Sequence, residues 1–349
     1  MQYLGIDVHS SASVWCLLDN DGQLVERGRV ATTRPALMAL AEKLSDSGPI
    51  LAGHEVGTQV YLVHDAFSDA GVKIEAFNAA HLRMIAASRK KTDKRDSYWI
   101  ARALQTGMKP HPVYIPRGDV REIRGLLAQR EAVVEDLKRW RLRARAQLRA
   151  RGVCIPRGSW RIDALVDQML EDPDGVDTHL LDALGLCDRT TALFAEELAN
   201  LEAELETKVR GNEVVERLRT IPGFGKLVSA CFYATICEIE RFSNARSLTS
   251  YVGLVPTIRQ TGDVAHLGHI SKEGSPRMRR LLVQAAHTVI RSSRADAQPL
   301  RSIYGRIAAN KQRKKIAVIA LARHLAKIAY HVWKDETEYN PKALRCSET

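Results

Sequence analysis

Long apolar runs are missing from this sequence. None of its segments approaches the roughly 20 consecutive apolar residues that a membrane-spanning helix needs. The first residues, Met1 to Gly5, also lack the basic and apolar regions of a secretory signal. These absences argue against membrane and secreted proteins, so we expect a cytoplasmic protein with no membrane partner.

Paired cysteines are missing as well. The six cysteines are scattered, and no Cys-x-x-Cys pair occurs. Neither a zinc knuckle nor a disulfide framework is therefore supported, and reduced, mostly structural thiols are expected. The cysteines are Cys16, Cys154, Cys187, Cys231, Cys237 and Cys346.

Acidic residues are scarce in the last third of the chain. The net charge is +11 over 349 residues, but residues 1–118 carry +2, residues 119–212 carry −3 and residues 213–349 carry +12. A basic excess of this size favours a polyanionic partner, because lysine and arginine neutralise phosphates and release counterions. Basic surfaces also serve membranes, but neither terminus has a basic amphipathic anchor. Nucleic acid is the expected partner.

The first 118 residues alternate between strand and helix patterns. A meander of three strands is predicted over residues 2–31, followed by a helix, a strand ending at Glu55, a second helix and a strand near Val72 to Phe77. This alternation predicts an α/β sheet. Three regions are expected: an α/β domain over 1–118, a helical middle region over 119–212 and a mainly α C-terminal domain over 213–349.

Four carboxylates in the α/β region are candidates for a metal site. Asp7 and Glu55 each end a predicted strand, where ligands bind in α/β sheets. Asp93 and Asp96 lie three apart near the start of a predicted helix, on one of its faces. Alone, the segment from Lys90 to Ser97 reads equally well as a capped helix with solvated charges. Together the four acids would repel one another unless cations were bound, and Mg²⁺ suits an all-oxygen set, with two ions serving phosphodiester chemistry.

Two long helices are predicted in the middle region, over about residues 119–151 and 178–209. In the first, apolar residues follow a heptad-like spacing that Arg130 and Arg141 interrupt, which predicts a short, imperfect coiled coil. Its C-terminal half is basic on all sides. A nucleic-acid contact and a solvated charged face explain that half equally well.

The C-terminal third opens with Pro222-Gly223-Phe224-Gly225-Lys226, before an apolar helix. This pattern predicts a helix-hairpin-helix, in which a glycine-rich turn holds a phosphate through backbone N–H groups. A purely structural turn between helices would require glycine equally. Downstream, Ser275 before Pro276 predicts a helix N-cap.

The order of these motifs resembles the insertion-sequence transposases of the IS one-ten family, a group that includes the pilin-gene invertase Piv. The matching segments are Leu4 to His9, Glu55 to Thr58, Lys91 to Asp96, and the C-terminal string from Tyr251 to Leu282. The resemblance implies a RuvC-like (RNase H-like) domain in which Asp7, Glu55, Asp93 and Asp96 bind Mg²⁺. It also implies projecting helices that mediate oligomer contacts and bind RNA, with a structured bridge RNA that selects donor and target DNA.

The family carries a nucleophilic serine immediately before the glycine of Gln260-Thr261-Gly262, and here that position is Thr261. The extra methyl group of threonine crowds an attack on phosphorus and restricts χ1. Thr261 is the preferred nucleophile. A neighbouring hydroxyl, Ser271 or Ser275, is the second option, and impaired strand transfer with intact binding is the third. His266 and His269 lie close to Thr261 in the sequence. Either is a candidate proton shuttle, but a phosphate contact or a loop-capping role is the favoured interpretation.

The sequence therefore predicts a Mg²⁺-dependent DNA transposase or recombinase that acts through a covalent hydroxyl–phosphate intermediate, as a homodimer or homotetramer, on the prokaryotic nucleoid. A RuvC-like structure-specific endonuclease with metal-activated water, and a nucleic-acid-binding relative with impaired catalysis, are the alternatives. The predicted nucleic-acid contacts are Lys91, Lys94, Arg95, Arg139, Arg143, Gly223, Gly225, Lys226, Lys272, Arg277, Arg279, Arg280, Arg313, Lys314 and Lys315.

Overall fold

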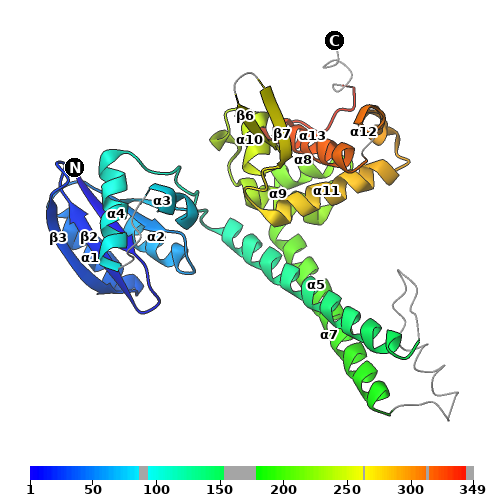
Figure 1. The fold of residues 1–349 in the computed structure, drawn as a ribbon, viewed down its shortest axis with the longest axis horizontal. Helices are drawn as coiled ribbons and strands as arrows, with labels where there is room; N and C mark the ends of the chain where they lie inside the picture. Colours follow the sequence, from blue (N-terminus) through cyan, green and yellow to red (C-terminus); the bar gives the residue numbers. More distant parts are fainter. Residues whose placement is uncertain (86–92, 153–177, 262–263, 312–313, 343–349) are drawn as a thin grey trace. The chain divides into compact units, whose positions relative to one another are not determined.

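The computed structural model divides the chain into two compact units, Met1–Pro116 and Arg117–Thr349. It describes residues 1–85, 93–152, 178–261, 264–311 and 314–342. Both units are drawn as ribbons in Figure 1.

Unit 1 is built on a five-stranded sheet of order β3-β2-β1-β4-β5. Strands β1, β2 and β3 form the predicted antiparallel meander, and β4 and β5 continue the sheet in parallel with β1. This arrangement confirms the mixed α/β class and is consistent with a RuvC-like domain. The strands are β1 (Gln2–Asp7), β2 (Ala12–Leu18), β3 (Leu24–Ala31), β4 (Ile50–Glu55) and β5 (Lys73–Phe77).

Helices cover both faces of this sheet. Helices α1 (Arg34–Ser45) and α2 (Val60–Asp69) bury apolar side chains against Leu4 and Ile6 of β1. Helix α4 (Asp93–Thr106) covers the opposite face, where Ile100 and Leu104 pack beside Phe77. Side chains alternate between the two faces of a strand, so the central strands β1 and β4 are covered on both sides, whereas the edge strand β3 is mostly exposed. Helix α3 (Ala79–Ile85) follows β5.

Unit 2 begins with two long helices that lie side by side, α5 (Asp119–Arg149) and α7 (Thr178–Val209) (Figure 1). They run antiparallel, because Glu122 pairs with Lys208 while Arg130, farther along α5, pairs with Glu202. The predicted seam is largely buried, including Ile123, Leu127, Leu137, Ala144 and Leu148. Arg130 interrupts this seam as expected, and its guanidinium group pairs with the neighbouring helix.

The remainder of unit 2 is a mainly helical body with one β-hairpin. Its core gathers buried side chains from nearly every helix, with Phe232, Leu282 and Leu325 among them. The mainly α class is confirmed, whereas the hairpin was not predicted. The elements are α8 (Glu213–Arg219), α9 (Lys226–Ile236), η1 (Ile239–Arg241), α10 (Ala245–Tyr251), β6 (Pro256–Thr261), β7 (Val264–Ile270), α11 (Pro276–Arg291), η2 (Ala295–Ala297), α12 (Gln298–Lys311) and α13 (Lys314–Lys334).

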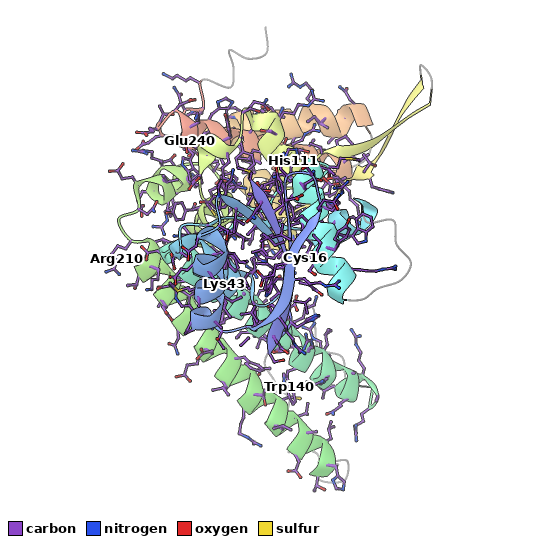
Figure 2. The ribbon with its side chains drawn as sticks, turned by 90° about the vertical axis from the view of Figure 1, so that its left-hand side faces the viewer. Cys16, Lys43, His111, Trp140, Arg210 and Glu240 are labelled. Carbon is purple, nitrogen blue, oxygen red and sulfur yellow. The ribbon has the colours of Figure 1, made fainter. Side chains whose placement is uncertain are left out.

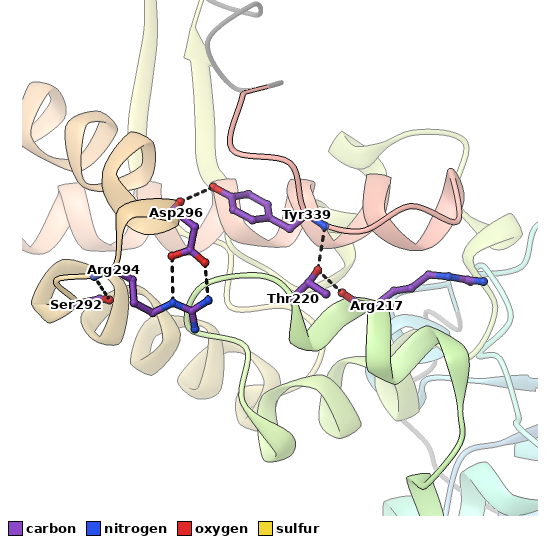
Figure 3. Close-up of polar contacts among 6 residues, drawn as sticks. All are labelled: Arg217, Thr220, Ser292, Arg294, Asp296 and Tyr339. Carbon is purple, nitrogen blue, oxygen red and sulfur yellow. Dashed lines mark hydrogen bonds and ion pairs between the residues drawn. The ribbon is translucent and has the colours of Figure 1, made fainter.

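A polar cluster fixes the turn between α8 and α9. The Tyr339 backbone N–H donates to Thr220 Oγ1 at 2.9 Å, and the Tyr339 hydroxyl donates to the Asp296 carbonyl at 3.2 Å (Figure 3). Burial, with the nearby Asp296 charge, raises the pKa of Tyr339 to about 12, so its hydroxyl stays protonated and remains a donor. The segment after α13 therefore ties this turn to η2.

In the parts of the chain that the structure describes, no helix has both the length and the apolar character that crossing a membrane requires. The four cysteines in those parts, Cys16, Cys187, Cys231 and Cys237, are free thiols. Cys154 and Cys346 lie outside the described residues.

Candidate active site and nucleic-acid interface

Asp7 and Glu55 lie side by side at the carboxyl ends of two parallel strands. Ile6 of β1 is in register with His54 of β4, so the next residue of each strand is one of these acids. Residues in register on parallel strands project from the same face, and such strands lie about 4.8 Å apart. The Asp7 side chain is 16% exposed, and its Oδ2 is 3.2 Å from His9 Nε2. The strand register therefore places Asp7 and Glu55 next to each other.

Two glycines allow α4 to approach the same face. A Cβ on Gly5 would meet the Ser97 carbonyl oxygen and would lie 2.5 Å from the Ala101 nitrogen. A Cβ on Gly53 would lie 2.9 Å from Leu104 Cδ1. Because Gly5 and Asp7 are two residues apart on one strand, both face α4. The face that carries Asp7 and Glu55 is therefore the one that α4 covers.

The first turn of α4 lies toward the acidic strand ends. At the other end of this helix, Gln105 Nε2 donates to the Asn20 carbonyl at 2.9 Å, in the turn between β2 and β3. That turn is next to the start of β1, since Tyr3 pairs with Leu18. Helix α4 thus runs antiparallel to β1, and Asp93 and Asp96 occupy its first turn. The fold brings this turn to the edge where Asp7 and Glu55 lie.

The acidic residue types at this edge are those that bind hard divalent cations. Asp7, Glu55 and Asp96 are all partly buried, and carboxylate oxygens are the ligands that Mg²⁺ prefers. Among the side chains that the structure describes, no three histidine, cysteine or acidic groups are close enough together to hold a metal ion. The Asp93 side chain is outside that set. The four-carboxylate metal cluster stays a prediction.

His54, which lies directly before Glu55, has a structural role that was not predicted from the sequence. Its side chain is fully buried, and Nδ1 lies 3.0 Å from the Glu55 carbonyl oxygen, to which it donates in the neutral ring. Burial lowers the pKa of His54 to about 4, with a smaller contribution from nearby His64. A neutral imidazole thus helps to fix the backbone of Glu55. A histidine inside an apolar strand was the available signal.

Thr261 is the last residue of β6, where its backbone pairs in register with Val264 of β7. It therefore lies at the tip of the hairpin, which extends away from the helices of its own unit in Figure 2. Its side chain is not among those that the structure describes, and neither is that of His266. The role of Thr261 as nucleophile stays a prediction.

The glycines of the C-terminal motif fix the segment that follows the hairpin. Gly253 and Gly274 have φ values of +75° and +71°, and a Cβ on either would meet the backbone of the opposing segment. The Lys272 N–H donates to the Gly253 carbonyl at 3.3 Å, and Lys272 also has a positive φ of 59° and is exposed. Their close approach is a packing requirement that the sequence motif alone does not reveal.

The two alternative hydroxyls have different surroundings. Ser275 is the N-cap of α11, and its Oγ accepts from the Met278 N–H at 3.2 Å, which confirms the predicted cap. Ser271 Oγ is buried and, among the described residues, has no hydrogen-bond partner. His269 is exposed, and its carbonyl accepts from Thr257 Oγ1 at 3.0 Å.

Three of the predicted phosphate contacts are engaged within unit 2. Arg277 Nε lies 2.5 Å from Glu131 Oε2, and Arg280 pairs with Glu131 and Glu135. Arg279 donates to the carbonyls of Val252, Glu273 and Gly274. These contacts hold α11 to α5 and to the loop before α11. The three arginines therefore stabilise the unit whether or not they also bind nucleic acid.

The other predicted contacts lie mostly at the surface. Arg139 pairs with Asp136 at 2.6 Å, and the Arg143 guanidinium lies 4.9 Å from the Trp140 ring centroid. Lys226 Nζ is 3.7 Å from Glu206 Oε1. Arg95, Lys314 and Lys315 are exposed, whereas Lys91 and Arg313 and the side chain of Lys94 are outside the described set.

The two glycines in the turn between α8 and α9 have different structural roles. Gly223 has a φ of +87°, and a Cβ there would lie 2.6 Å from the Ala285 carbonyl oxygen. Gly225 is the N-cap of α9 with a φ of −81°, and a Cβ there would meet nothing within 4 Å. Packing thus requires the first glycine only. Phosphate binding by a helix-hairpin-helix stays a prediction.

Comparison with known proteins identifies relatives over almost the whole chain. Residues 4–151 match the DEDD transposase model of the IS110 type, and residues 215–301 match the model described as "Transposase IS116/IS110/IS902 family". The transposase for insertion sequence element IS1111A of Coxiella burnetii is 23% identical, over 97% of this chain and 91% of its own length. The transposase for IS1328 of Yersinia enterocolitica is 24% identical, over 97% and 98%. A probable family 20 transposase of Pseudomonas aeruginosa is 31% identical over 41% of this chain and 42% of its own length.

The α/β fold, the acidic strand ends and the first matched segment define a transposase of the DEDD class, a class of enzyme that cleaves DNA and transfers strands. The second matched segment, residues 215–301, identifies the family within this class. The chain belongs to the IS110 family of insertion-sequence transposases.

Proposed function

We propose that this transposase cleaves and exchanges DNA strands through a covalent intermediate between Thr261 and a DNA phosphate. The observation that carries the proposal is the position of Thr261 at the tip of the β6–β7 hairpin, in the motif where the family has its nucleophilic serine. The strand-end acids of unit 1 supply the other half of the chemistry.

The step balances in bonds and protons. The Thr261 Oγ–phosphorus bond forms while the bond from phosphorus to a deoxyribose oxygen breaks, and the threonine proton ends on the departing oxygen. One phosphodiester replaces another, so no external energy source is needed. The free hydroxyl of another strand then attacks the same phosphorus and regenerates Thr261.

Asp7, Glu55, Asp93 and Asp96 would hold Mg²⁺, and we propose two ions. Bound ions supply charge stabilisation to the phosphate oxygens. The protein's contribution is to hold these carboxylates close together, and His54 and Gly5 both contribute to this. His54 holds the backbone at Glu55, and Gly5 allows α4 to approach β1 at Ser97 and Ala101.

Guidance by a structured bridge RNA and assembly into a dimer or tetramer belong to the same proposal. Support comes from the exposed basic half of α5, where Arg143 lies over the Trp140 ring, a combination suited to RNA backbone and bases. Double-stranded DNA of donor and target would be the substrate, in a prokaryotic cytoplasm.

Covalent trapping tests the proposal. The full chain is incubated with Mg²⁺, DNA carrying the element's ends and RNA transcribed from its flanks, and adducts are separated under denaturing conditions. Wild type is expected to give a DNA adduct that Thr261→Ala abolishes. Asp7→Asn should slow adduct formation by about a hundredfold or more, as for loss of one charge-stabilising group. A Thr261→Ala protein that cleaves at the wild-type rate would refute the covalent step.

The threonine itself favours a second candidate, a relative with impaired catalysis, because its methyl group hinders attack. Thr261→Ser distinguishes the two. Weak wild-type activity that the serine variant raises supports the covalent mechanism with a hindered nucleophile. An inert wild type that serine activates supports the impaired relative. Cleavage that neither Thr261→Ser nor Thr261→Ala changes indicates a RuvC-like endonuclease that uses water.

A further inference from the structure

A basic cavity lies at the base of the β6–β7 hairpin. It has a volume of about 440 Å³ and is lined by Arg246, Thr249, Ser250, Val255, Pro256, Arg323 and Lys327. Pro256 is the first residue of β6, the strand that ends at Thr261. Its three charged residues, Arg246, Arg323 and Lys327, lie outside the C-terminal string from Tyr251 to Leu282, and its size falls in the range of about 300–1,000 Å³ that is typical of ligand sites.

The three cations converge from two helices. Arg323 and Lys327 are four residues apart on α13 and so share one face of it, while Arg246 lies in the first turn of α10. Among the described residues, no carboxylate pairs with any of these three side chains, unlike Arg277 or Arg280. The described residues that line the cavity include no acidic side chain. Three like charges around one cavity repel one another unless an anion is bound.

The remaining lining suits an oxygen-rich anion. Ser250 is exposed and offers a hydroxyl, and the Thr249 hydroxyl already donates to the Arg246 carbonyl at 2.9 Å, which leaves its oxygen as an acceptor. Arginine binds phosphate in a bidentate manner, and lysine adds a point charge. Val255 and Pro256 provide an apolar wall of the kind that a sugar contacts.

We propose that this cavity binds a backbone phosphate of the nucleic-acid strand on which the hairpin acts, which makes it a positioning site. This inference rests on the proposed function, because the cavity would hold the same strand that Thr261 is proposed to attack. An extended strand rises about 3.3 Å per residue, so the five steps from Pro256 to Thr261 span at most about 17 Å. One strand can therefore reach both the cavity and the hairpin tip.

The test compares variants of the full chain that carry equal charge losses. Arg323→Gln with Lys327→Gln removes two cavity charges, and Lys334→Gln with Arg291→Gln removes two charges elsewhere on α13 and α11. Binding to short DNA and RNA oligonucleotides of one base sequence is measured against salt concentration, in EDTA so that no cleavage occurs.

The magnitude of the slope of log K against log salt concentration should fall by about 0.7 to 0.9 for the cavity variant, as for one lost phosphate contact. Affinity at fixed salt should fall about tenfold or more. The control pair should keep the wild-type slope.

A smaller salt slope with DNA, alone or together with RNA, supports the proposal. A smaller slope with RNA alone overturns it, because the cavity would then bind a strand that Thr261 does not attack. Equal slopes for the cavity and control variants, with both oligonucleotides, overturn the proposal. The charge-preserving exchange Arg323→Lys with Lys327→Arg separates charge loss from misfolding. It should retain the wild-type slope, and a loss equal to that of the neutral pair also overturns the proposal. Adduct formation by wild type is scored separately, so failure of the cavity leaves the covalent mechanism standing.

Discussion

At the scale of single residues, the neutral state of His54 links the acidic strand ends of unit 1 to pH. The imidazole is buried with its Nδ1 at the Glu55 carbonyl, and Nε2 has no hydrogen-bond partner among the described residues. Charging this ring would place an uncompensated cation beneath the sheet. Its folded pKa of about 4 lies below the ordinary value of 6.5, so the unfolded chain binds more protons between these values.

This linkage predicts an acid-dependent loss of stability in unit 1. The contribution of His54 is fully present above about pH 6.5 and is lost as the pH falls toward 4. A difference of this size corresponds to about 3 kcal/mol in the free energy of unfolding. Chemical denaturation across this pH range should show a flatter dependence for His54→Gln than for wild type. His111→Gln, at an exposed position of the same unit, is the matched control. Identical pH slopes for His54→Gln and wild type would contradict the linkage.

At the scale of elements, the contact between β1 and α4 decides where the helical acids lie. It depends on the absence of a side chain at Gly5, because a Cβ there would meet backbone atoms of α4. Backbone atoms of a helix shift only together, so the cost is larger than that of a rotamer change.

Gly5→Ala should therefore destabilise unit 1 by about 1–3 kcal/mol, the usual cost of overpacking. It should also reduce adduct formation, because the first turn of α4 is displaced from the strand ends. Gly57→Ala is the matched control for stability, since a Cβ at Gly57 would meet nothing within 4 Å. Thermal unfolding measures the first effect and covalent trapping the second. Wild-type stability of Gly5→Ala would show that α4 does not pack on β1 as described.

The turn between α8 and α9 offers a second matched pair of glycines. Gly223→Ala should destabilise unit 2 by about 1 kcal/mol or more, through its positive φ and the Ala285 carbonyl oxygen. Gly225→Ala should leave stability within about 0.5 kcal/mol. If the turn binds phosphate through backbone N–H groups, Gly225→Ala should weaken DNA binding even so. Calorimetry and salt-dependent binding separate the two roles, and full DNA affinity in Gly225→Ala would leave the turn as purely structural.

At the scale of the whole molecule, the chain divides into an acidic-site unit and a basic, mainly helical unit. Each has its own apolar core, so each is expected to unfold as a cooperative body. A ligand that binds one unit then stabilises that unit alone.

Calorimetry in rising Mg²⁺ should therefore move one of two unfolding transitions. At a magnesium concentration about a hundred times its Kd, the gain is about 2.7 kcal/mol. The transition that Gly5→Ala lowers identifies unit 1, and this is the transition that Mg²⁺ should raise. Asp7→Asn should weaken the response. A magnesium shift confined to the other transition would place the metal site outside unit 1.

Much of this fold is predictable from sequence because local patterns agree with it. The meander, β4, the long helices α5 and α7 and the Ser275 cap follow from alternation, heptad spacing and capping chemistry. The β6–β7 hairpin was missed, because glycine, histidine and arginine interrupt its alternation. Its strands pair mainly with each other, so burial leaves little hydrophobic pattern to read.

The sequence by itself determined the class of protein, the four candidate acids and the threonine at the serine position, since these depend on residue type and order. Only the tertiary structure decided that Asp7 and Glu55 are neighbours in register and that α4 runs antiparallel to β1 over Gly5. It alone separated Arg277 and Arg280, paired with Glu131, from Arg246, Arg323 and Lys327 around a basic cavity. The physical reason is that charge and hydrogen-bonding capacity are properties of a residue, whereas their pairing depends on which distant segments the packed core brings together.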